Sequence, residues 1–563
     1  MPASDNLTLL HILRRSAERY GDRTALAMVD GPRMTYESFA DHVGSVSHFL
    51  HDRGIISGDR VAILSENRPN WGVAYFAITT MGAIVVPILP DFHASEIQHI
   101  IRHAGCKAVF VSKRLYGQLE GADFPELETM ILLEDFTIIP PQTKKDKLSE
   151  LLEQGGREFA KLKEAALKLT RRIPSTVQPD DVAAIVYTSG TTGHSKGVML
   201  THKNLSSDAV AGVQIVSVTE NDRMLSILPL SHTYECTLGL VTPIMAGASV
   251  YYLDKLPTAA VLLPALIKVK PTIVLSVPLV IEKIYKASIL PKLTGKALIR
   301  GLYKVPLIRK RLNRIAGKKL LATFGGELRV FCIGGAALAP DVEMFLREAK
   351  FPYAIGYGLT ETAPLVAGTN PARTKYRSTG PAVRGATIVI DKPDSITGEG
   401  EILVKGPMVM KGYYRDSKRT EDVLTKDGWF RTGDLGVFDG QGYLYIKGRL
   451  KNLILGPSGK NIYPEEIEST INEFDVVLES LVFAQNNQLI ARIHLNYEKL
   501  DQQFPSQQLS ESQIRQRIKK LLEDLRREVN ERVATFSRIH KVIEQMEPFE
   551  KTATQKIKRH LYV

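Results

Sequence analysis

The sequence is poor in cysteine, with three among 563 residues. Cys106, Cys236 and Cys332 lie far apart, and none belongs to a Cys-x-x-Cys pair. The spacing therefore predicts neither a disulfide framework nor a zinc site. Unpaired thiols fit a reducing compartment, so we expect a cytoplasmic protein.

Long apolar runs are also missing. Residues 1–13 include the acidic Asp5 and lack the apolar centre of a signal peptide. The most apolar stretch, residues 261–281, is interrupted by Lys268, Lys270 and prolines. Because a membrane span needs about 20 consecutive apolar residues, we interpret this stretch as a buried helix and strand. No internal repeat or low-complexity tract is evident.

Acidic residues are absent from residues 283–326, although this segment contains twelve basic ones, as many as the net charge of +12 for the whole chain. A patch of this kind attracts membranes, phosphates or nucleic acid. Apolar residues alternate with the cations, which is consistent with peripheral membrane contact through Lys283 to Lys319. A solvated helix is an alternative, and the lack of a base-reading motif predicts no nucleic-acid partner. The interleaved apolar residues are Leu298, Leu302, Val305, Leu312 and Ile315.

The length of the chain exceeds the size at which single cores stop growing, about 250–300 residues, so we expect at least two domains. β-Rich runs alternate with helical patterns in the N-terminal part, as in α/β folds. Short strands and turn residues after Gly380 predict a small antiparallel β region, and the part after Arg449 predicts a compact α+β domain. The predicted strands are 59–64, 108–111, 182–187, 223–228, 249–252, 272–277, 329–333, 387–391, 400–404, 429–431, 436–439, 442–446, 479–484, 490–495 and one near Ile539. The predicted helices are 71–81, 94–104, one within 143–172, one near Pro464, and 510–534.

A loop rich in glycine and hydroxyl residues, 187–197, directly follows the predicted strand 182–187. Glycines let a phosphate approach the backbone, hydroxyl and N–H groups donate hydrogen bonds, and Lys196 supplies a positive charge. We interpret the loop as a phosphate cradle; a ligand-free surface loop is the alternative. It differs from the P-loop, in which the lysine precedes Ser or Thr, because Gly197 follows Lys196.

Six further motifs follow in order: PLSH (229–232), IGGA (333–336), YGLTE (357–361), WFRTGD (429–434), GRLK (448–451) and KTATQK (551–556). Together with the loop they resemble the adenylate-forming superfamily of acyl-CoA synthetases, firefly luciferase and peptide synthetase adenylation domains. The resemblance runs from about Leu10 to the C-terminus. It implies a large N-terminal domain (1–450) of α/β subdomains plus a small β region, and a small mobile α+β C-terminal domain (451–563).

The resemblance also implies the roles of individual residues. Glu361 would hold Mg²⁺, with Thr191 as a second ligand, and a carboxylate suits this ion, which otherwise keeps waters and phosphate oxygens. The catalytic residues would be Lys556, His232, Thr360, Glu361 and Lys196. The residues that bind ATP or CoA would be Thr188, Ser189, Gly190, Thr191, Thr192, Gly193, Lys196, Gly334, Gly335, Ala336, Tyr357, Gly358, Thr360, Asp434, Arg449, Lys451, Gly459 and Lys556.

Within that set, Gly334 to Ala336 and Tyr357 would sandwich adenine, and Asp434 would accept hydrogen bonds from the ribose hydroxyls. His232 would gate the acyl pocket. Taken singly, these residues have plainer interpretations: Glu361 as a solvated loop glutamate, the paired glycines as a tight turn, and His232 as a structural histidine.

Lys556 lies near the end of the chain and would reach the site only if the small domain closes over it. In the family the small domain rotates about the position of Lys451, with one orientation for adenylation and another for thioester formation. The second orientation would bring Gly459 to a tunnel for the pantetheine arm of CoA.

Residues 277–285, the basic insertion and residues 324–329 resemble long-chain fatty acid–CoA ligases. The leading hypothesis is therefore a ligase that uses ATP, Mg²⁺ and CoA to convert a fatty acid to acyl-AMP and then to acyl-CoA. One alternative is an acyl-AMP ligase that loads an acyl carrier protein, and another is a non-catalytic AMP- or lipid-binding protein. The basic insertion would in addition suit the phosphates of CoA.

Overall fold

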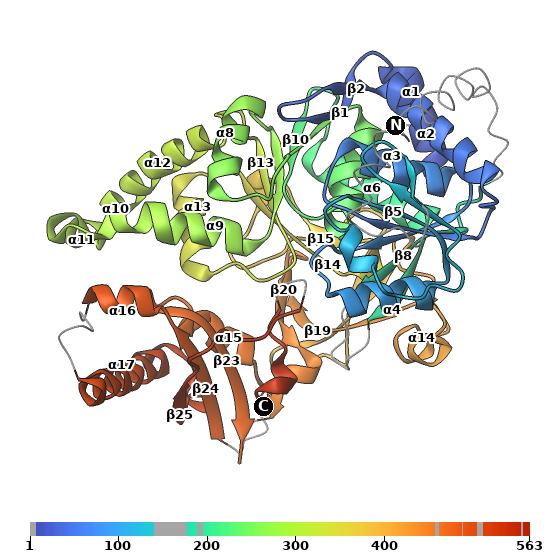
Figure 1. Ribbon diagram of the computed structural model, residues 1–563. Coiled ribbons are helices and arrows are strands. Elements are labelled where there is room, and N and C mark those ends of the chain that lie inside the picture. The colour runs from blue at the N-terminus through green and yellow to red at the C-terminus, as the bar shows by residue number, and fades with distance from the viewer. Residues whose placement is uncertain are drawn as a thin grey trace.

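The computed structural model describes residues 7–139, 177–188, 195–455, 461–486, 488–503, 510–552 and 556–563. In these residues the N-terminal part builds two large sheets and a small antiparallel one, and the C-terminal part builds a smaller sheet with its own helices (Figure 1). The fold class predicted from the sequence, α/β with an additional α+β part, is confirmed.

The first large sheet has the strand order β15-β14-β13-β12-β10-β11-β1-β2. The strands from β14 to β1 in this order pair in parallel, and their residues are mostly buried. Strands of parallel sheets are apolar over nearly their whole length because both faces are covered. The strands are β1 (Thr24–Met28), β2 (Arg33–Thr35), β10 (Arg223–Ser226), β11 (Ser249–Tyr252), β12 (Ile273–Ser276), β13 (Val330–Ile333), β14 (Tyr353–Gly358) and β15 (Leu365–Gly368).

The second large sheet has the order β18-β9-β8-β4-β3-β5-β6-β7. Its β8 and β9 are antiparallel, and the central residues of the predicted phosphate loop connect them. The helix predicted within 143–172 lies outside the described residues. The strands are β3 (Arg60–Leu64), β4 (Ile84–Ile88), β5 (Cys106–Val111), β6 (Thr129–Leu132), β7 (Ile138–Ile139), β8 (Val182–Thr188), β9 (Lys196–Thr201) and β18 (Gly412–Tyr413).

Helix α3 (Pro69–Thr80) lies between the two large sheets and contacts β1 of one and β3 and β4 of the other. It is buried on nearly all sides, as expected of a helix that is apolar all round. The predicted helices 71–81 and 94–104 are confirmed by α3 and by α4 (Ala94–Ala104). Further helices of this part are α1 (Leu9–Tyr20), α2 (Tyr36–Asp52), α6 (His202–Val216), the π-helix η3 (Tyr234–Val241), α7 (Thr242–Ala246), α13 (Pro340–Ala349) and α14 (Ser417–Val423).

The apolar stretch 261–281 is only partly buried, which corrects the interpretation from the sequence. Strand β12 is fully buried, but α8 (Ala259–Val269) leaves Leu263 44% and Ile267 53% exposed. Among the described helices, none combines the length and apolarity required to cross a bilayer.

The small antiparallel sheet has the order β16-β17-β19-β20. The strands predicted at 429–431 and 436–439 are wrong as separate elements, because β19 (Phe430–Phe438) runs through both. The Gly-Asp sequence between them predicts a turn. Instead, Gly433 adopts φ +69° and the pairing register shifts after Leu435, but the chain remains within the sheet. The other strands are β16 (Thr387–Asp391), β17 (Gly400–Lys405) and β20 (Leu444–Arg449).

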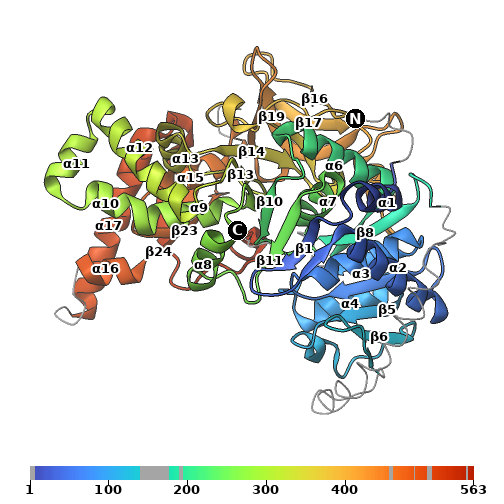
Figure 2. The ribbon, with the colours of Figure 1, turned by 90° about the horizontal axis from the view of Figure 1, so that it is seen from above.

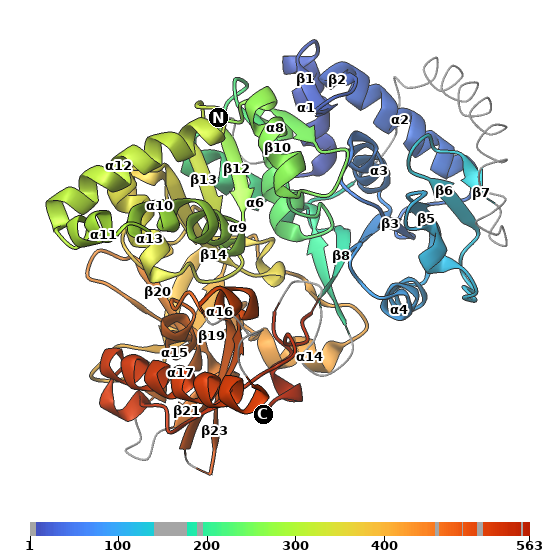
Figure 3. The same cartoon turned by 60° about the vertical axis from the view of Figure 1, so that its left-hand side comes forward.

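The C-terminal part has its own core, in which Ile467, Leu495, Leu525 and Val529 are buried together. The predicted elements near 464, 479–484, 490–495 and 510–534 are confirmed, and the last strand begins slightly later than expected. The elements are β21 (Ile454–Leu455), β22 (Asn461–Ile462), α15 (Pro464–Ile471), β23 (Val477–Gln485), β24 (Gln488–Leu495), α16 (Tyr497–Gln503), α17 (Glu511–Arg532) and β25 (Lys541–Glu544). Figure 3 shows this part beneath the edge of the first sheet.

Residues 278–323 form a helical arm that projects from the first sheet, as both Figure 1 and Figure 2 show. At its base Tyr285 packs against Phe345 of α13, with ring centroids 5.0 Å apart. The arm consists of α9 (Pro278–Ile284), the π-helix η4 (Tyr285–Ile289), α10 (Leu290–Thr294), α11 (Ala297–Tyr303) and α12 (Pro306–Thr323).

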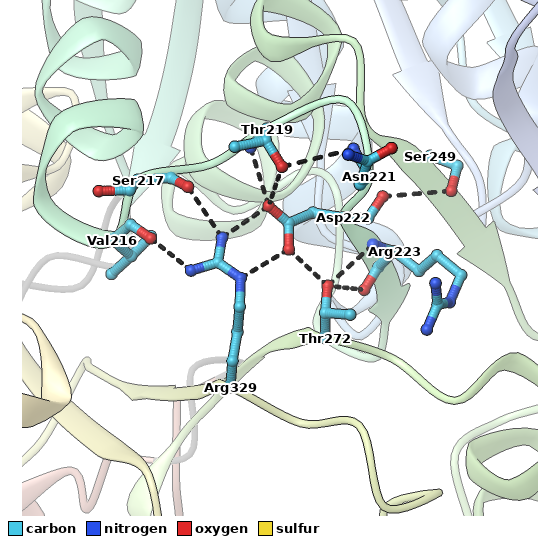
Figure 4. Close-up of polar contacts among 9 residues, drawn as sticks. All are labelled: Val216, Ser217, Thr219, Asn221, Asp222, Arg223, Ser249, Thr272 and Arg329. Atoms are coloured by element: carbon cyan, nitrogen blue, oxygen red, sulfur yellow. Dashed lines mark hydrogen bonds and ion pairs between the residues drawn. The ribbon is translucent and has the colours of Figure 1, made fainter.

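An ion pair between Asp222 and Arg329 ties together elements that are distant in the sequence (Figure 4). Arg329 donates from Nε to Asp222 Oδ1 at 2.7 Å and from Nη2 to Oδ2 at 2.6 Å, and its Nη1 donates to the Val216 carbonyl at 2.6 Å. Asp222 also accepts from the Thr272 hydroxyl at 2.7 Å. The pair thus joins the end of α6 to the starts of β10, β12 and β13.

We expect Asp222→Ala to lower the free energy of unfolding by about 2–3 kcal/mol, because the Asp222 side chain is only 4% exposed and its loss leaves the guanidinium without its charge partner. The measurement is a urea unfolding curve. The exposed pair of Asp30 and Lys268 supplies the control, since Asp30→Ala should change the free energy by less than about 1 kcal/mol. Equal effects of the two substitutions would contradict the role of Asp222.

Candidate functional site

Two of the predicted motifs, 333–336 and 357–361, lie at the carboxyl end of the first sheet. Strand β13 ends at Ile333, next to Gly334, and its parallel neighbour β14 carries Tyr357 and Gly358. Ligands of open α/β sheets bind outside the carboxyl ends of the strands. The geometry therefore places the predicted adenine segment at the position where such folds bind ligands.

Lys196 and Glu361 form an ion pair at this end of the sheet. The Lys196 ammonium donates to Glu361 Oε1 at 2.6 Å and to the Tyr413 hydroxyl at 2.7 Å, and that hydroxyl donates to Glu361 Oε1 at 2.8 Å. Burial alone would raise the pKa of Glu361, but the charge and hydrogen bond of Lys196 lower it instead. Glu361 is therefore an ionised, buried carboxylate, and Tyr413 is a neighbour that the sequence analysis missed.

Asp434 and Arg449 are brought together by the pairing of β19 with β20. Arg449 Nε lies 2.7 Å from Asp434 Oδ1, and the Tyr357 hydroxyl donates to Asp434 Oδ2 at 2.7 Å. Burial raises the pKa of Asp434, against the opposing effects of Arg449 and Tyr357. The predicted ribose acceptor and the predicted adenine neighbour are thus held in direct contact.

The glycines of the site lie where a side chain would meet neighbouring groups or a strained backbone. A Cβ on Gly334 would lie 3.2 Å from Cζ of Tyr234, and one on Gly358 would lie 1.6 Å from the Pro364 carbonyl oxygen. Gly335 adopts φ +86°, which favours glycine. Packing at Gly358 and the backbone conformation of Gly335 therefore already favour glycine, and Tyr234 is an aromatic neighbour of the site that the sequence analysis did not identify.

His232 is held as a neutral ring. Its Nδ1 accepts the backbone N–H of Tyr234 at 3.2 Å, which leaves the ring proton on Nε2. Burial and then the positive charge of Lys556 lower the pKa of His232 to about 4. A neutral ring with a protonated Nε2 suits a gate or a hydrogen-bond donor, whereas a general base would need a free nitrogen lone pair.

Glu235, which the sequence analysis also missed, is a buried carboxyl group in the π-helix η3. It is 1% exposed, and its Oε1 accepts from the Ser226 hydroxyl at 2.5 Å. Its Oε2 has no hydrogen-bond partner among the described residues. Burial raises the pKa of Glu235 to about 8, so this side chain is protonated at neutral pH.

Lys556 of the C-terminal part lies within electrostatic reach of the N-terminal site. Burial and the positive charge of Arg449 lower the pKa of Lys556. The negative charges of Asp434 and Glu361 act to raise it. The residue as a whole is exposed at the surface of the C-terminal part. Lys556 thus stands close to charges from β19, β20 and the segment after β14.

Contacts between the two parts of the chain hold this arrangement. The Tyr463 hydroxyl of the C-terminal part donates to Glu399 Oε2 at 2.6 Å, and the Lys447 ammonium lies 3.8 Å from Glu466 Oε1. Lys286 of the helical arm donates to the Asn472 carbonyl at 2.6 Å. Lys451, the predicted hinge, lies between β20 and β21.

Several predicted site residues lie outside the described residues: Ser189, Gly190, Thr191, Thr192, Gly193 and Gly459. Thr188, which precedes this segment, has a buried hydroxyl with no partner among the described residues. It lies opposite Lys196 in the β8–β9 pairing. A phosphate oxygen would satisfy that hydroxyl. Of the other predicted residues, Thr360 begins the short turn that carries Glu361, and Ala336 is exposed after Gly335.

Glu361 fits the requirements of Mg²⁺. Over the described residues, no group of three or more His, Cys, Asp or Glu side chains is arranged to hold a metal. Mg²⁺, however, is often bound by one or two carboxylates, with substrate phosphates and waters as the remaining ligands. Glu361 is a carboxylate that stays ionised and lies beside the cationic Lys196.

The fold is that of the adenylate-forming enzymes. The crystal structure of ATP-bound MatB from Rhodopseudomonas palustris superposes with a TM-score of 0.75 at 24% identity and covers 99% of this chain and 98% of its own. An ATP-bound RpMatB-BxBclM chimera superposes with a TM-score of 0.76 at 25% identity and covers the same shares.

The chain belongs to the AMP-binding enzyme family, whose model matches residues 13–414. A long-chain-fatty-acid–CoA ligase of Mycobacterium bovis is 30% identical over 483 residues, which cover 81% of this chain and 76% of the relative. The peroxisomal long chain acyl-CoA synthetase 6 of Arabidopsis thaliana is 28% identical and covers 86% and 71%, respectively.

Proposed function

We propose that this protein activates a long-chain fatty acid with ATP and transfers the acyl group to CoA. The observation that carries the proposal is the convergence of Lys556 from the C-terminal part with Glu361, Asp434 and Arg449 from the N-terminal part. A protein that only bound AMP would not need a lysine from a second domain beside the phosphate-side carboxylate. The names of the relatives, long-chain fatty acid–CoA ligases, support the same substrate class.

In the first step a carboxylate oxygen of the acid attacks the α-phosphorus of ATP, the bond to the β-phosphate oxygen breaks, and pyrophosphate leaves. Lys196 and the Thr188 hydroxyl would bind phosphate oxygens, and Lys556 would stabilise the charge that develops between the acid and the α-phosphate. Mg²⁺, held by Glu361 and Thr191, would neutralise phosphate charge. Asp434 would orient the ribose.

In the second step the CoA thiol releases its proton to solvent and its sulfur bonds to the acyl carbonyl carbon, the bond from that carbon to the phosphate oxygen breaks, and AMP leaves. The neutral His232 would gate the acyl pocket. We assign residues 1–450 and 451–563 to two domains that rotate about Lys451 between the steps. The contacts of Tyr463 and Glu466 with the N-terminal part would then belong to the adenylation orientation, and Gly459 would face CoA in the other.

The test is an assay of pyrophosphate release with ATP, Mg²⁺ and fatty acids of increasing chain length, with CoA or acyl carrier protein as acceptor. We expect release that depends on the acid, stops when EDTA removes the metal, and yields acyl-CoA. If the acyl group is transferred to carrier protein and not to CoA, then carrier protein is the acceptor in place of CoA. Absence of pyrophosphate with every acid would refute an activating enzyme of this kind.

A further inference from the structure

Residues 296–319 of the helical arm contain basic and apolar residues and no acidic residue. Ten of the twelve cations between Lys283 and Lys319 are exposed. None of these ten forms an ion pair with an acidic side chain in the described part of the chain. The two others are engaged: Lys286 donates to the Asn472 carbonyl, and Arg309 pairs with Glu348 at 2.7 Å.

Large apolar side chains gather at the tip of the arm, among these cations. Leu298 is 77% and Leu307 78% exposed, and Leu302 and Val305 between them are also exposed. Helix α11 has no buried residue at all. Exposed leucines at this density cost free energy in water, so they indicate a surface that is covered by a partner.

Helix α12 has two different faces. Asn313, Gly317 and Leu320 recur at i, i+4 and i+7 and are buried, and a Cβ on Gly317 would lie 2.6 Å from the Ala349 carbonyl oxygen of α13. The opposite face carries exposed residues at i, i+4, i+7, i+8 and i+11: Leu307, Arg311, Arg314, Ile315 and Lys318. One face thus attaches the helix to the fold, and the other presents cations and apolar groups together to the outside.

We infer that this surface binds an anionic lipid bilayer, with the leucines of the tip inserted at the level of the headgroups and the cations against lipid phosphates. Helices that combine Lys and Arg with leucines bind membrane interfaces by apolar burial and electrostatic attraction together. A second copy of the chain docked through the same face would bring like charges together. The free phosphates of CoA would explain the cations but not the exposed leucines.

The base of the arm adjoins the candidate site, so a membrane bound by the arm would lie near that site. Helix α9 begins directly after Val277, and a Cβ on Gly335 would lie 3.7 Å from Val277 Cγ1. A bilayer at the tip would therefore bring a source of fatty acid close to the site; this benefit, although not the binding itself, rests on the proposed function.

The experiment is flotation of the full-length protein with vesicles of phosphatidylcholine alone or mixed with phosphatidylglycerol, without ATP, acid or CoA. We expect the protein to bind the mixed vesicles and to be released by salt. The charge variant Arg311→Gln/Arg314→Gln/Lys318→Gln should bind roughly 100-fold more weakly, at about five-fold per cation. The apolar variant Leu298→Ser/Leu307→Ser should bind the mixed vesicles at least about ten-fold more weakly.

The control is Lys418→Gln/Lys426→Gln, which removes two exposed cations on and near α14, remote from the arm in Figure 1, and should bind like the wild type. Binding of the charge variant at wild-type strength, or equal binding of wild type to both vesicles, would overturn the inference. If the charge variant binds vesicles like the wild type but has a raised KM for CoA, the inference is also overturned, and the cations are assigned to CoA binding. Because flotation needs no turnover, its failure is distinct from failure of the proposed ligase activity.

Discussion

Lys556→Ala should slow acid-dependent pyrophosphate release by about 100- to 1,000-fold, the loss typical when one preorganised charge is removed from the developing charge of a transition state. Lys556 is the C-terminal cation that lies near Glu361, Asp434 and Arg449. Transfer from supplied acyl-AMP to CoA should change by no more than a few-fold, because the proposed second orientation moves Lys556 away from the site. The measurements are pyrophosphate release and thioester formation on the same preparation.

Lys558→Ala is the matched control, since Lys558 lies two residues further along and pairs with Glu550 at 3.4 Å. It should leave both half-reactions close to the wild type. Equal loss of both half-reactions in Lys556→Ala would contradict a domain that changes orientation between the steps. An unchanged adenylation rate would remove Lys556 from the proposed chemistry altogether.

The contribution of Glu235 to the stability of the protein should fall between about pH 5 and about pH 8, and Glu235→Gln should remove this contribution. In the unfolded chain this carboxyl loses its proton near pH 4.5, whereas in the fold it keeps the proton up to about pH 8. Between those values the folded state binds more protons than the unfolded state, so stability decreases as the pH rises. At about 1.4 kcal/mol per pH unit, the contribution is on the order of 4 kcal/mol.

Glutamine has nearly the shape of the protonated carboxyl group and can still accept from the Ser226 hydroxyl. Urea unfolding at the two pH values should therefore show Glu235→Gln to be more stable than the wild type at the higher pH and similar at the lower one. Glu421→Gln, at an exposed position of α14, is the control and should follow the wild type. Parallel pH profiles for Glu235→Gln and the wild type would show that Glu235 ionises normally in the fold.

The ion pair of Lys196 with Glu361 shows how far motifs in the sequence could define the site. Both residues stand in motifs that resemble those of the family, so their roles could be predicted without coordinates. Tyr413, which joins the pair, stands 217 residues after Lys196 in a segment without a comparable signal. Its hydroxyl enters the site only because β18 pairs with β9.

Local patterns also failed where long-range contacts outweighed them. The Gly-Asp sequence inside β19 predicts a turn, but pairing with β17 and β20 on both sides keeps the chain extended. Glu235 has no sequence pattern that marks it as buried, because acidic residues are rarely buried and only the packing of η3 removes this one from water.

The sequence by itself determined the alternation of strands and helices, the order of the motifs and the basic segment, because these depend on the period of apolar residues and on residue type at short spacing. Only the tertiary structure decided which side chains meet at the carboxyl end of the first sheet, which glycines are required by packing, and which face of α12 remains outside. Each of these depends on contacts between residues far apart in the chain, whose free energy exists only after the sheets and the C-terminal part have assembled.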